Sequence, residues 1–374
     1  MASGDYSSLT SRLPSLGFEA PLTEEEKAFS KNLRLRVWAL TVCACAHAVF
    51  FLRFLTAFRC KILDGANFPN SWLAKYRIMK FNKGCLRIGV LGCGHLGKQL
   101  VLSLLALEDV TPVNITISTR RPEKHSDLTD LGVKCFYDNK RLATSVDVMF
   151  LCCLPSHLIA VSSQIRGYIS KSCIVYSFIT AVPAPRLKHL LAHSTIVRPI
   201  YFFHSSPWAK LWDTGKSPVE ALQIQEVIEV TSPFKETYTP CLNLKWFEEI
   251  MYSVLNVGYL LKVPHILSVD ILNDLLFSPS QYVEAMDNPV LLMDESFVNQ
   301  SCLQSLSHNS PFPWFDLSSV SMRDTPLTLF LSLYPSLLQH FSFIYRISML
   351  KKKDQPNIED CCRSLTSQKR DENS

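Results

Sequence analysis

The chain has 374 residues, of which 47% are hydrophobic and 19% are charged, so it is long enough for two domains with buried cores. Its formal net charge of +5 is small, and lysine and arginine are scattered rather than gathered on one periodic face. Composition therefore gives no support for a nucleic-acid-binding protein.

The N-terminal region contains a polar leader followed by a predicted helix. Residues 1–22 have no clear hydrophobic period, whereas "TEEEK" places Thr23 and Glu26 at the spacing of a capping box. The uncharged run 37–52 has sixteen residues, fewer than the roughly 20 that a bilayer span needs. We favour a packed helix in a soluble domain, and a membrane-associated helix is the alternative. The Gly, Pro and Asn residues of 64–72 indicate a linker.

Short apolar runs then alternate with helical ones between residues 84 and 203. Helical periodicity is found over 96–107 and 184–192. Near-continuous apolar strands between helices are typical of a parallel sheet that is covered on both faces. The predicted strands are 86–92, 114–119, 133–137, 146–154, 172–178 and 195–203.

The remainder of the chain has mainly helical periodicity. Residues 204–350 are predicted to form an all-helical C-terminal domain, and the polar residues 351–374 a disordered tail. The expected helices cover 219–230, 242–262, 264–277 and 326–350, the last of these forming one or two helices around Pro335.

A glycine motif lies between the first strand and the first helix of the alternating region. In "LRIGVLGCGHLGKQL" the glycines follow the pattern G-x-G-x-x-G, and this strand–motif–helix order is the context in which the pattern indicates a dinucleotide-binding turn. Gly92 permits the tight turn, Gly94 lets the backbone approach a pyrophosphate, and Gly97 lets the helix pack against the strand. The predicted cofactor-binding turn consists of Gly92, Cys93, Gly94, His95, Leu96 and Gly97.

The end of the second strand indicates which dinucleotide binds. NAD sites usually carry Asp or Glu there, whereas this chain has Ser118, Thr119, Arg120 and Arg121. Hydroxyl groups and arginines can bind a phosphate dianion. We therefore predict NADP(H) as the cofactor, bound in a Rossmann domain over residues 84–203 that is preceded by a leader and helical extension over 1–83.

Several segments together resemble the cofactor domain of pyrroline-5-carboxylate reductases. They are "RIGVLGCGHLGKQLVLSLL", "ISTRRPEK", "LGVKCFYDNKRLATSVDVMFLCCLPSHL" and "VYSFITAVPAPRLKHLL". The resemblance implies that Asn139 lies near the adenosine ribose and that Leu154 and Pro155 border the nicotinamide. His157, just beyond, could line the same pocket, although a packing role is favoured for it.

The helical region departs from that family. In pyrroline-5-carboxylate reductases the substrate-binding segments of the helical region contain several glycines, whereas residues 240–350 of this chain contain only Gly258. Two functions remain as alternatives. One is an oxidoreductase acting on a C=N or C=O bond of a small metabolite, with a cyclic imine as a candidate substrate. The other is an inactive NADP(H)-binding protein with a sensing or structural role. Reduction of a carbonyl needs a proton donor. Tyr201 and His204 are candidates, with aromatic packing as the favoured alternative.

Cysteine usage indicates the compartment. The thirteen cysteines are odd in number and include no C-x-x-C pair, so neither a disulfide framework nor a metal site is expected. These features favour reduced thiols in a cytoplasmic protein. The expected partner is a small-molecule substrate, with a homo-oligomer possible and membrane association not expected.

Overall fold

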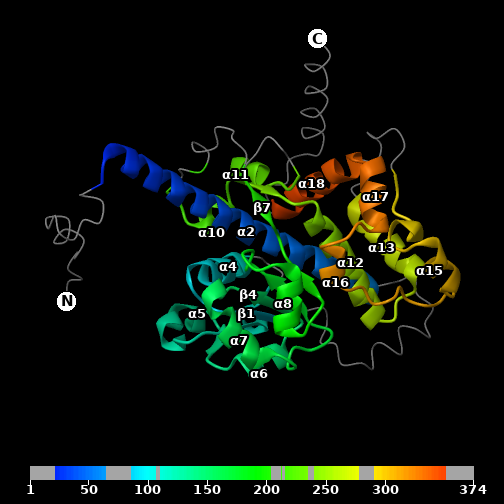
Figure 1. Ribbon diagram of the computed structural model, residues 1–374, viewed down its shortest axis with the longest axis horizontal. Coiled ribbons are helices and arrows are strands. Elements are labelled where there is room, and N and C mark those ends of the chain that lie inside the picture. The colour runs from blue at the N-terminus through cyan, green and yellow to red at the C-terminus, as the bar shows by residue number, and fades with distance from the viewer. Residues whose placement is uncertain are drawn as a thin grey trace, which may run out of the picture.

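The structure is a computed structural model that shows one long helix, a parallel sheet and a group of C-terminal helices (Figure 1). The expected leader, linker and C-terminal tail lie almost entirely outside the residues that it describes. Those residues are 22–64, 86–106, 110–203, 212, 215–234, 240–277 and 290–350.

The N-terminal helix α2 spans Glu24–Asp64 and runs from a projecting end across the molecule (Figure 1). Its expected capping box is confirmed, because Glu26 N donates to Thr23 Oγ1 at 3.3 Å and Thr23 N donates to Glu26 Oε2 at 2.8 Å. The helix is long and apolar enough to cross a membrane, but 72% of its most apolar stretch is buried inside the protein. Most of the run 37–52 is thus buried, and α2 as a whole packs against the first helix after the glycine motif and against helices of the C-terminal region.

The predicted parallel sheet is confirmed, with the strand order β3-β2-β1-β4-β5-β6. Strand β1 is central, and Ile88 lies beside Ile115 of β2 on one side and Val148 of β4 on the other. In this order the chain first adds strands on one side of β1 and then on the other. The point where the order reverses lies between β1 and β4, next to the glycine motif, as in Rossmann folds. The strands are β1 (Ile88–Leu91), β2 (Ile115–Ser118), β3 (Lys134–Phe136), β4 (Val148–Leu151), β5 (Ile174–Ser177) and β6 (Ile196–Val197).

Helices cover both faces of the sheet, and alternate residues of each strand face different cores. Val90, Phe150 and Tyr176 belong to the larger core, which includes α2 and α4, whereas Met149 and Val175 belong to the smaller core. The connecting helices are α4 (His95–Leu105), α5 (Ser126–Asp130), α6 (Asn139–Ser145), α7 (Leu158–Ile165) and α8 (Ala184–Leu191), with 3₁₀ turns η2 (Pro112–Asn114), η3 (Pro122–His125) and η4 (Pro155–His157).

The C-terminal region is mainly helical, as expected. The bend at Pro335 separates α17 from α18 by 96°, because proline cannot donate the backbone hydrogen bond of a continuous helix. The elements are α10 (Pro218–Ala221), α11 (Gln225–Val230), α12 (Lys245–Leu260), α13 (His265–Phe277), η5 (Asp294–Ser296), α15 (Gln300–Ser305), α16 (Leu317–Val320), α17 (Pro326–Leu333) and α18 (Ser336–Met349).

Three details of the sequence prediction are wrong. The expected helix 219–230 is divided in two, because α10 ends at Ala221 and α11 begins at Gln225. The run 195–203 is not one strand of the parallel sheet, because β6 ends at Val197 and the chain then forms β7 (Tyr201–Phe202). Strand β7 pairs antiparallel with β8 (Cys241–Leu242), so the C-terminal region is not entirely helical. Pro199 between the two strands has no N–H group and cannot continue the ladder of the parallel sheet.

A tryptophan and a tyrosine join the sheet to the C-terminal helices. Trp246 of α12 donates from Nε1 to Tyr176 Oη of β5 at 3.0 Å, and both side chains are fully buried. Phe51 of α2 packs beside Tyr176, with ring centroids 5.2 Å apart. Helix α2 therefore lies in the same core as the sheet and α12, although it precedes both in the sequence.

Candidate functional site

The glycine motif forms the turn between β1 and α4. Gly92 has φ +95°, a conformation that side chains disfavour, and its amide donates to the carbonyl of Ser118 at 2.9 Å. A Cβ on Gly97 would lie 2.2 Å from the carbonyl oxygen of Gly92. The turn and the start of α4 are thus packed so closely that only glycine fits at position 97.

The middle glycine has open space around it. Gly94 is the N-cap of α4, is exposed, and would meet no atom within 4 Å if it carried a Cβ. No side chain caps this helix end, and its first turn contains no acidic residue. The first amides of a helix have no partner within the helix and attract anions. An incoming phosphate group can therefore approach the backbone here without displacing a side chain.

The other residues of the turn differ in exposure. Cys93 is buried, which raises the pKa of its thiol to about 12, and its Sγ lies 3.6 Å from Nδ1 of His125. His95 is exposed, whereas Leu96 is half-buried and packs against the larger core. Among these side chains, that of His95 is the most open to a ligand.

At the end of β2, Ser118 and Asn139 form a buried hydrogen-bond network. Ser118 Oγ donates to Asn139 Oδ1 at 2.7 Å and accepts from Asp138 N at 3.2 Å. Asn139 Nδ2 donates to Gln164 Oε1 of α7 at 2.7 Å. Ser118 is 0% exposed, so its hydroxyl holds the start of α6 against β2 in this structure rather than facing a ligand. The sequence offered no signal for this role, which depends on the neighbouring strand.

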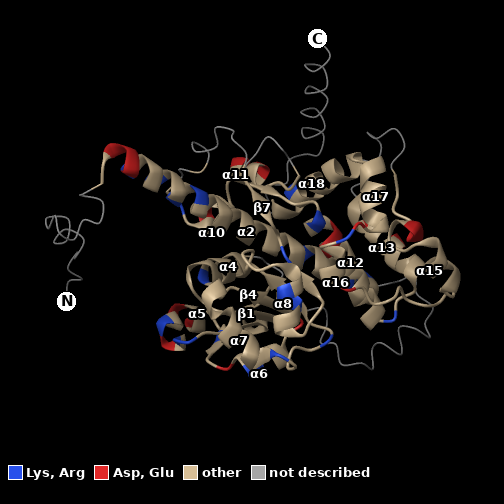
Figure 2. Cartoon of the chain, in the orientation of Figure 1, with Lys and Arg blue, Asp and Glu red and all other residues tan. Residues whose placement is uncertain are grey.

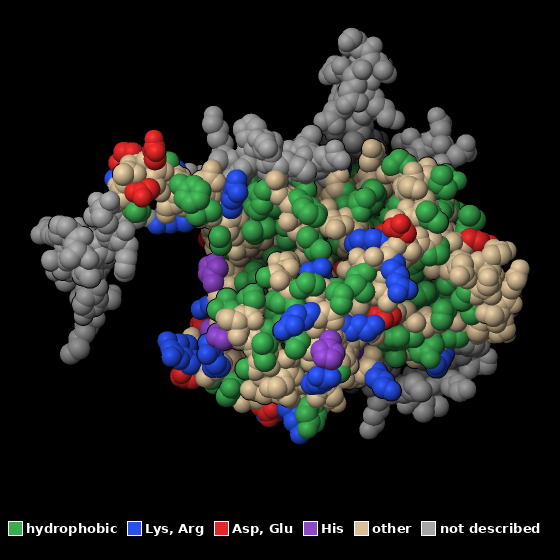
Figure 3. Space-filling view, in the orientation of Figure 1, with side chains coloured by type: hydrophobic (Ala, Val, Ile, Leu, Met, Phe, Trp, Pro, Cys, Tyr) green, Lys and Arg blue, Asp and Glu red, His purple; other side chains and the backbone are tan. Residues whose placement is uncertain are grey.

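The next residues leave the sheet and become accessible. Thr119 is half-buried, and its amide donates to the carbonyl of Phe136 at 2.9 Å. Arg120 and Arg121 are exposed. Figure 2 colours Lys and Arg positions blue along the ribbon beside α5, and Figure 3 shows blue side chains on the same part of the surface. The structure leaves these arginines open to solvent, and their binding of a phosphate stays a prediction.

A further arginine near this edge was not identified from the sequence. Arg141 of α6 is exposed, and its guanidinium carbon lies 4.6 Å from the ring centroid of Phe136, the last residue of β3. The neighbouring Lys140 instead extends over Tyr168, with its Nζ 4.0 Å from that ring centroid. The basic pair in "DNKRLA" was the available signal, but only the fold shows that the two cations point toward different aromatic rings.

The residues expected beside the nicotinamide follow β4. Leu154 is 62% exposed and Pro155 is exposed, while His157 is half-buried at the end of η4. Because β1 and β4 are parallel, the end of β4 lies at the same edge of the sheet as the glycine turn after β1. The structure thus brings these positions to one edge, and their contact with a cofactor stays a prediction.

The hydroxyl of Tyr201 contacts helix α2 inside the protein. Its hydroxyl lies 3.0 Å from Nδ1 of His47, whose Nε2 lies 2.8 Å from the carbonyl oxygen of Thr231. A carbonyl only accepts, so Nε2 carries the proton of a neutral imidazole and Tyr201 donates to Nδ1. Burial lowers the pKa of His47 to about 4. This geometry favours the packing alternative for Tyr201, and the other candidate, His204, lies outside the described residues.

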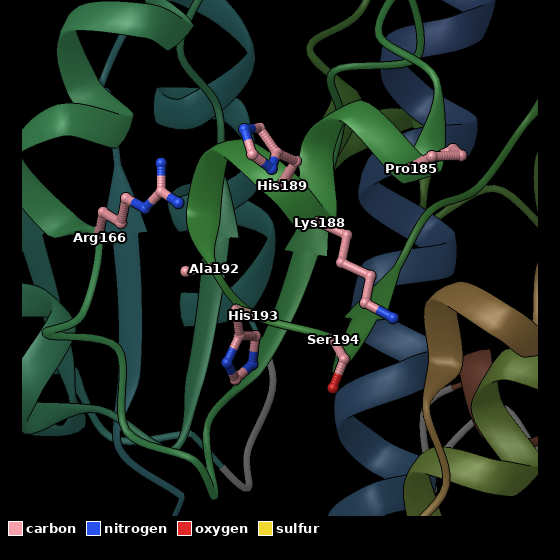
Figure 4. Close-up of a pocket in the computed structure, with 7 residues that line it drawn as sticks. All are labelled: Arg166, Pro185, Lys188, His189, Ala192, His193 and Ser194. Atoms are coloured by element: carbon pink, nitrogen blue, oxygen red, sulfur yellow. The ribbon is translucent and has the colours of Figure 1, made fainter.

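A separate open hollow of about 410 Å³ lies where α8 ends and β6 begins (Figure 4). The glycine turn lies at the opposite ends of the strands, so this hollow is distinct from the predicted cofactor site. Lys188 at its rim forms an ion pair with Asp316, and His193 donates from Nε2 to the carbonyl of Cys173 at 2.8 Å. The remaining lining residues are Arg166, Pro185, His189, Ala192 and Ser194.

Comparisons with known proteins agree with the Rossmann site. Residues 87–178 match the family described as NADP oxidoreductase, coenzyme F420-dependent. The NADP-dependent oxidoreductase domain-containing protein 1 of Mus musculus is 35% identical to this chain over 368 residues, which cover 96% of this chain and 98% of the mouse protein. That similarity extends through both the sheet and the helical regions.

The similarity to pyrroline-5-carboxylate reductases is shorter. The Escherichia coli enzyme is 31% identical over 108 residues, which are 29% of this chain and 40% of that enzyme's length. The resemblance inferred from the sequence is thus confirmed for part of the chain. The structure of the Coxiella burnetii enzyme aligns with 71% of this chain and 99% of its own at 14% identity, with a TM-score of 0.29.

Proposed function

Because the chain belongs to the family of the NADP-dependent oxidoreductase domain-containing protein 1, we propose that it is an oxidoreductase that uses NADP(H) to reduce a C=N or C=O bond of a small metabolite. The glycine turn is the observation that carries the proposal. It combines the close packing of Gly97 against Gly92 with open space at Gly94, directly at an uncapped helix N-terminus.

The described residues fit a dinucleotide phosphate. The turn 92–97 and the first amides of α4 would hold the pyrophosphate, because they offer hydrogen-bond donors and no nearby carboxylate in that first turn. Arg120 and Arg121 would bind the 2′-phosphate at the end of β2. Asn139 would lie near the adenosine ribose, where its position is fixed by Ser118 and Gln164. Leu154 and Pro155 would border the nicotinamide.

The bound cofactor would supply the reducing equivalent, a hydride from the reduced nicotinamide. The protein then has to orient the acceptor and exclude water from it. Exposed Leu154 offers an apolar surface for that purpose after β4. No proton donor is assigned, because the hydroxyl of Tyr201 is already donated to His47. A C=N bond is the better hydride acceptor for this site, since an imine nitrogen can arrive already protonated. We therefore propose a cyclic imine as the substrate.

One feature favours an alternative, in which the chain binds NADP(H) without turnover. In the described part of 240–350 the one glycine, Gly258, lies inside α12, where an added Cβ would be 2.9 Å from Ser268 Oγ. It is buried at this contact between helices and therefore does not provide the glycine-dependent substrate contacts of the pyrroline-5-carboxylate reductases. We also propose a cytoplasmic location, which is supported by the buried free thiols of Cys43, Cys93 and Cys173.

Two measurements test the proposal in sequence. Isothermal titration of the purified full-length protein with NADPH and NADH should show binding of NADPH with the tighter affinity. A stopped-flow scan of cyclic imines and carbonyl compounds should then show oxidation of bound NADPH by at least one cyclic imine. NADPH binding without oxidation by any compound would support the inactive alternative, and binding of neither nucleotide would contradict both.

A further inference from the structure

The position of Arg141 relative to the end of β2 is set by the sheet. Its guanidinium carbon lies 4.6 Å from the ring centroid of Phe136. Phe136 pairs with Ser118 in the parallel ladder, and its carbonyl accepts from the amide of Thr119 at 2.9 Å. Arg141 is therefore stacked on the residue directly beside the point where the chain leaves β2 toward Arg120.

The start of α6 is also fixed to β2 by side chains. Ser118 holds both Asn139 and the amide of Asp138, while Asn139 is further bound by Gln164. The amide of Arg141 donates to Asp138 Oδ1 at 2.9 Å, which engages that carboxylate in the helix cap. Because Ser118 and Asn139 are buried, they hold the start of α6 in place, while the side chain of Arg141 is exposed.

This arrangement prepares the guanidinium for binding a phosphate. A guanidinium that stacks on a ring keeps its N–H groups in the plane available for hydrogen bonds, and its planar fork matches phosphate oxygens. Stacking also restricts the side chain before the ligand arrives, so less conformational entropy is lost on binding. Arg120 and Arg121 follow the end of β2, and Arg121 precedes η3.

We propose that Arg141 is a third arginine of the 2′-phosphate site and determines, together with Arg120 and Arg121, the preference for NADP(H) over NAD(H). This inference rests on the proposed function, since it assigns an additional residue to the same cofactor site. Phe136 is a positioning residue in it, because the ring holds the guanidinium and does not itself contact the phosphate.

The experiment compares Arg141→Ala with Lys140→Ala. Both substitutions remove one cation from the exposed first turn of α6, but Lys140 points toward Tyr168 and not toward β3. The probes are NADPH, NADH and adenosine 2′,5′-bisphosphate, whose dissociation constants are measured by titration calorimetry. We expect Arg141→Ala to weaken the binding of NADPH and of the bisphosphate about tenfold, because one charge-assisted phosphate contact is lost. The dissociation constant of NADH should change by less than about twofold.

Two further variants separate charge from geometry. Arg141→Lys keeps the charge but loses the planar fork, and Phe136→Leu keeps the arginine but loses its ring support. Each should weaken NADPH binding by less than Arg141→Ala does and should leave NADH binding unchanged. Thermal unfolding of each variant verifies that the sheet edge remains folded.

Several results would overturn the proposal. An unchanged NADPH to NADH ratio in Arg141→Ala would remove Arg141 from the site, and the proposed function would stand if the wild type still preferred NADPH. If Arg141→Ala weakened NADPH and NADH binding equally, or if Lys140→Ala had the same effect as Arg141→Ala, Arg141 would not select for the 2′-phosphate. If the wild-type protein bound neither nucleotide, this inference and the proposed function would both be wrong.

Discussion

Two regions use buried polar groups for different purposes. One is the cofactor edge of the sheet, which comprises the glycine turn 92–97, residues 118–121 and the start of α6. The other is the junction, where Tyr201 and α12 connect the sheet with α2 and the C-terminal helices. At the cofactor edge, Ser118 and Asn139 are buried so that neighbouring backbone and arginines can remain exposed. At the junction, the hydroxyl of Tyr201 and both nitrogens of His47 are bonded to other parts of the protein. The first region thus leaves backbone and arginines exposed, as the proposed cofactor site requires, whereas the polar groups of the second join segments that are distant in the sequence.

The largest expected effect is at the glycine turn. Gly97→Ala places a Cβ 2.2 Å from the carbonyl oxygen of Gly92, so the turn must move and NADPH should bind at least about a hundredfold more weakly, equivalent to about 2.8 kcal/mol. Gly94→Ala is the matched control for folding, because its Cβ meets no protein atom within 4 Å. It should keep the wild-type melting temperature but still weaken NADPH. Wild-type NADPH affinity in Gly94→Ala would contradict a pyrophosphate at this turn.

The next effect concerns the two arginines after β2. Replacing both Arg120 and Arg121 with Ala should erase most of a preference for NADPH over NADH that we expect to be at least about tenfold. NADH affinity should remain nearly the same, because no 2′-phosphate is present to bind. Higher salt should also narrow the wild-type preference, since both side chains are exposed. Titration at low and high salt checks this, and a double variant with the wild-type ratio would show that these arginines are merely solvated.

A pH-dependent effect is expected at the junction. Glu249 of α12 is 1% exposed, and burial raises the pKa of its carboxyl from an ordinary value near 4.5 to about 8. The folded state therefore retains a proton that the unfolded state loses, and stability should fall as pH rises from 4.5 to 8, by up to about 1.4 kcal/mol per pH unit. Glu249→Gln should remove this part of the slope. Urea unfolding between about pH 6.5 and 8 measures it, and parallel wild-type and variant profiles would contradict the assignment.

The smallest expected effect is for Tyr201→Phe. The variant removes the hydroxyl that donates to Nδ1 of His47, so the free energy of unfolding should fall by about 1 kcal/mol. NADPH affinity should not change, because the contact belongs to the junction and not to the cofactor edge. If a substrate is found, turnover should also be retained. A large loss of turnover at unchanged stability would instead identify Tyr201 as a proton donor and remove the contrast between the two regions.

The sheet and the cofactor turn could be predicted because their determinants are local. Apolar runs of strand length, separated by helical periods, specify a parallel sheet, and the three glycines follow the first strand directly. The two errors that concern strands, at 195–203 and at Cys241–Leu242, involve strands of only two residues. Such short strands depend on the partner across the ladder, which periodicity within one segment does not reveal.

The candidate site was predicted less completely for the same reason. Ser118 was expected to face the cofactor because hydroxyl groups suit a phosphate, but the strand turns its side chain toward Asn139. Arg141 was missed because its relation to the end of β2 passes through Phe136 in another strand. In both cases residue type gave the chemistry, while the direction of the side chain depended on a neighbouring strand or helix.

The sequence by itself determined the Rossmann architecture, the glycine turn and the absence of a carboxylate at the end of β2, since each follows from residues that are close together in the chain. Only the tertiary structure decided that α2 is buried beside the sheet, that Tyr201 is bonded to His47, and that Arg141 stacks on Phe136 of β3. These contacts join residues from separate elements, and their geometry is fixed by packing in the shared core, which no local pattern of residues encodes.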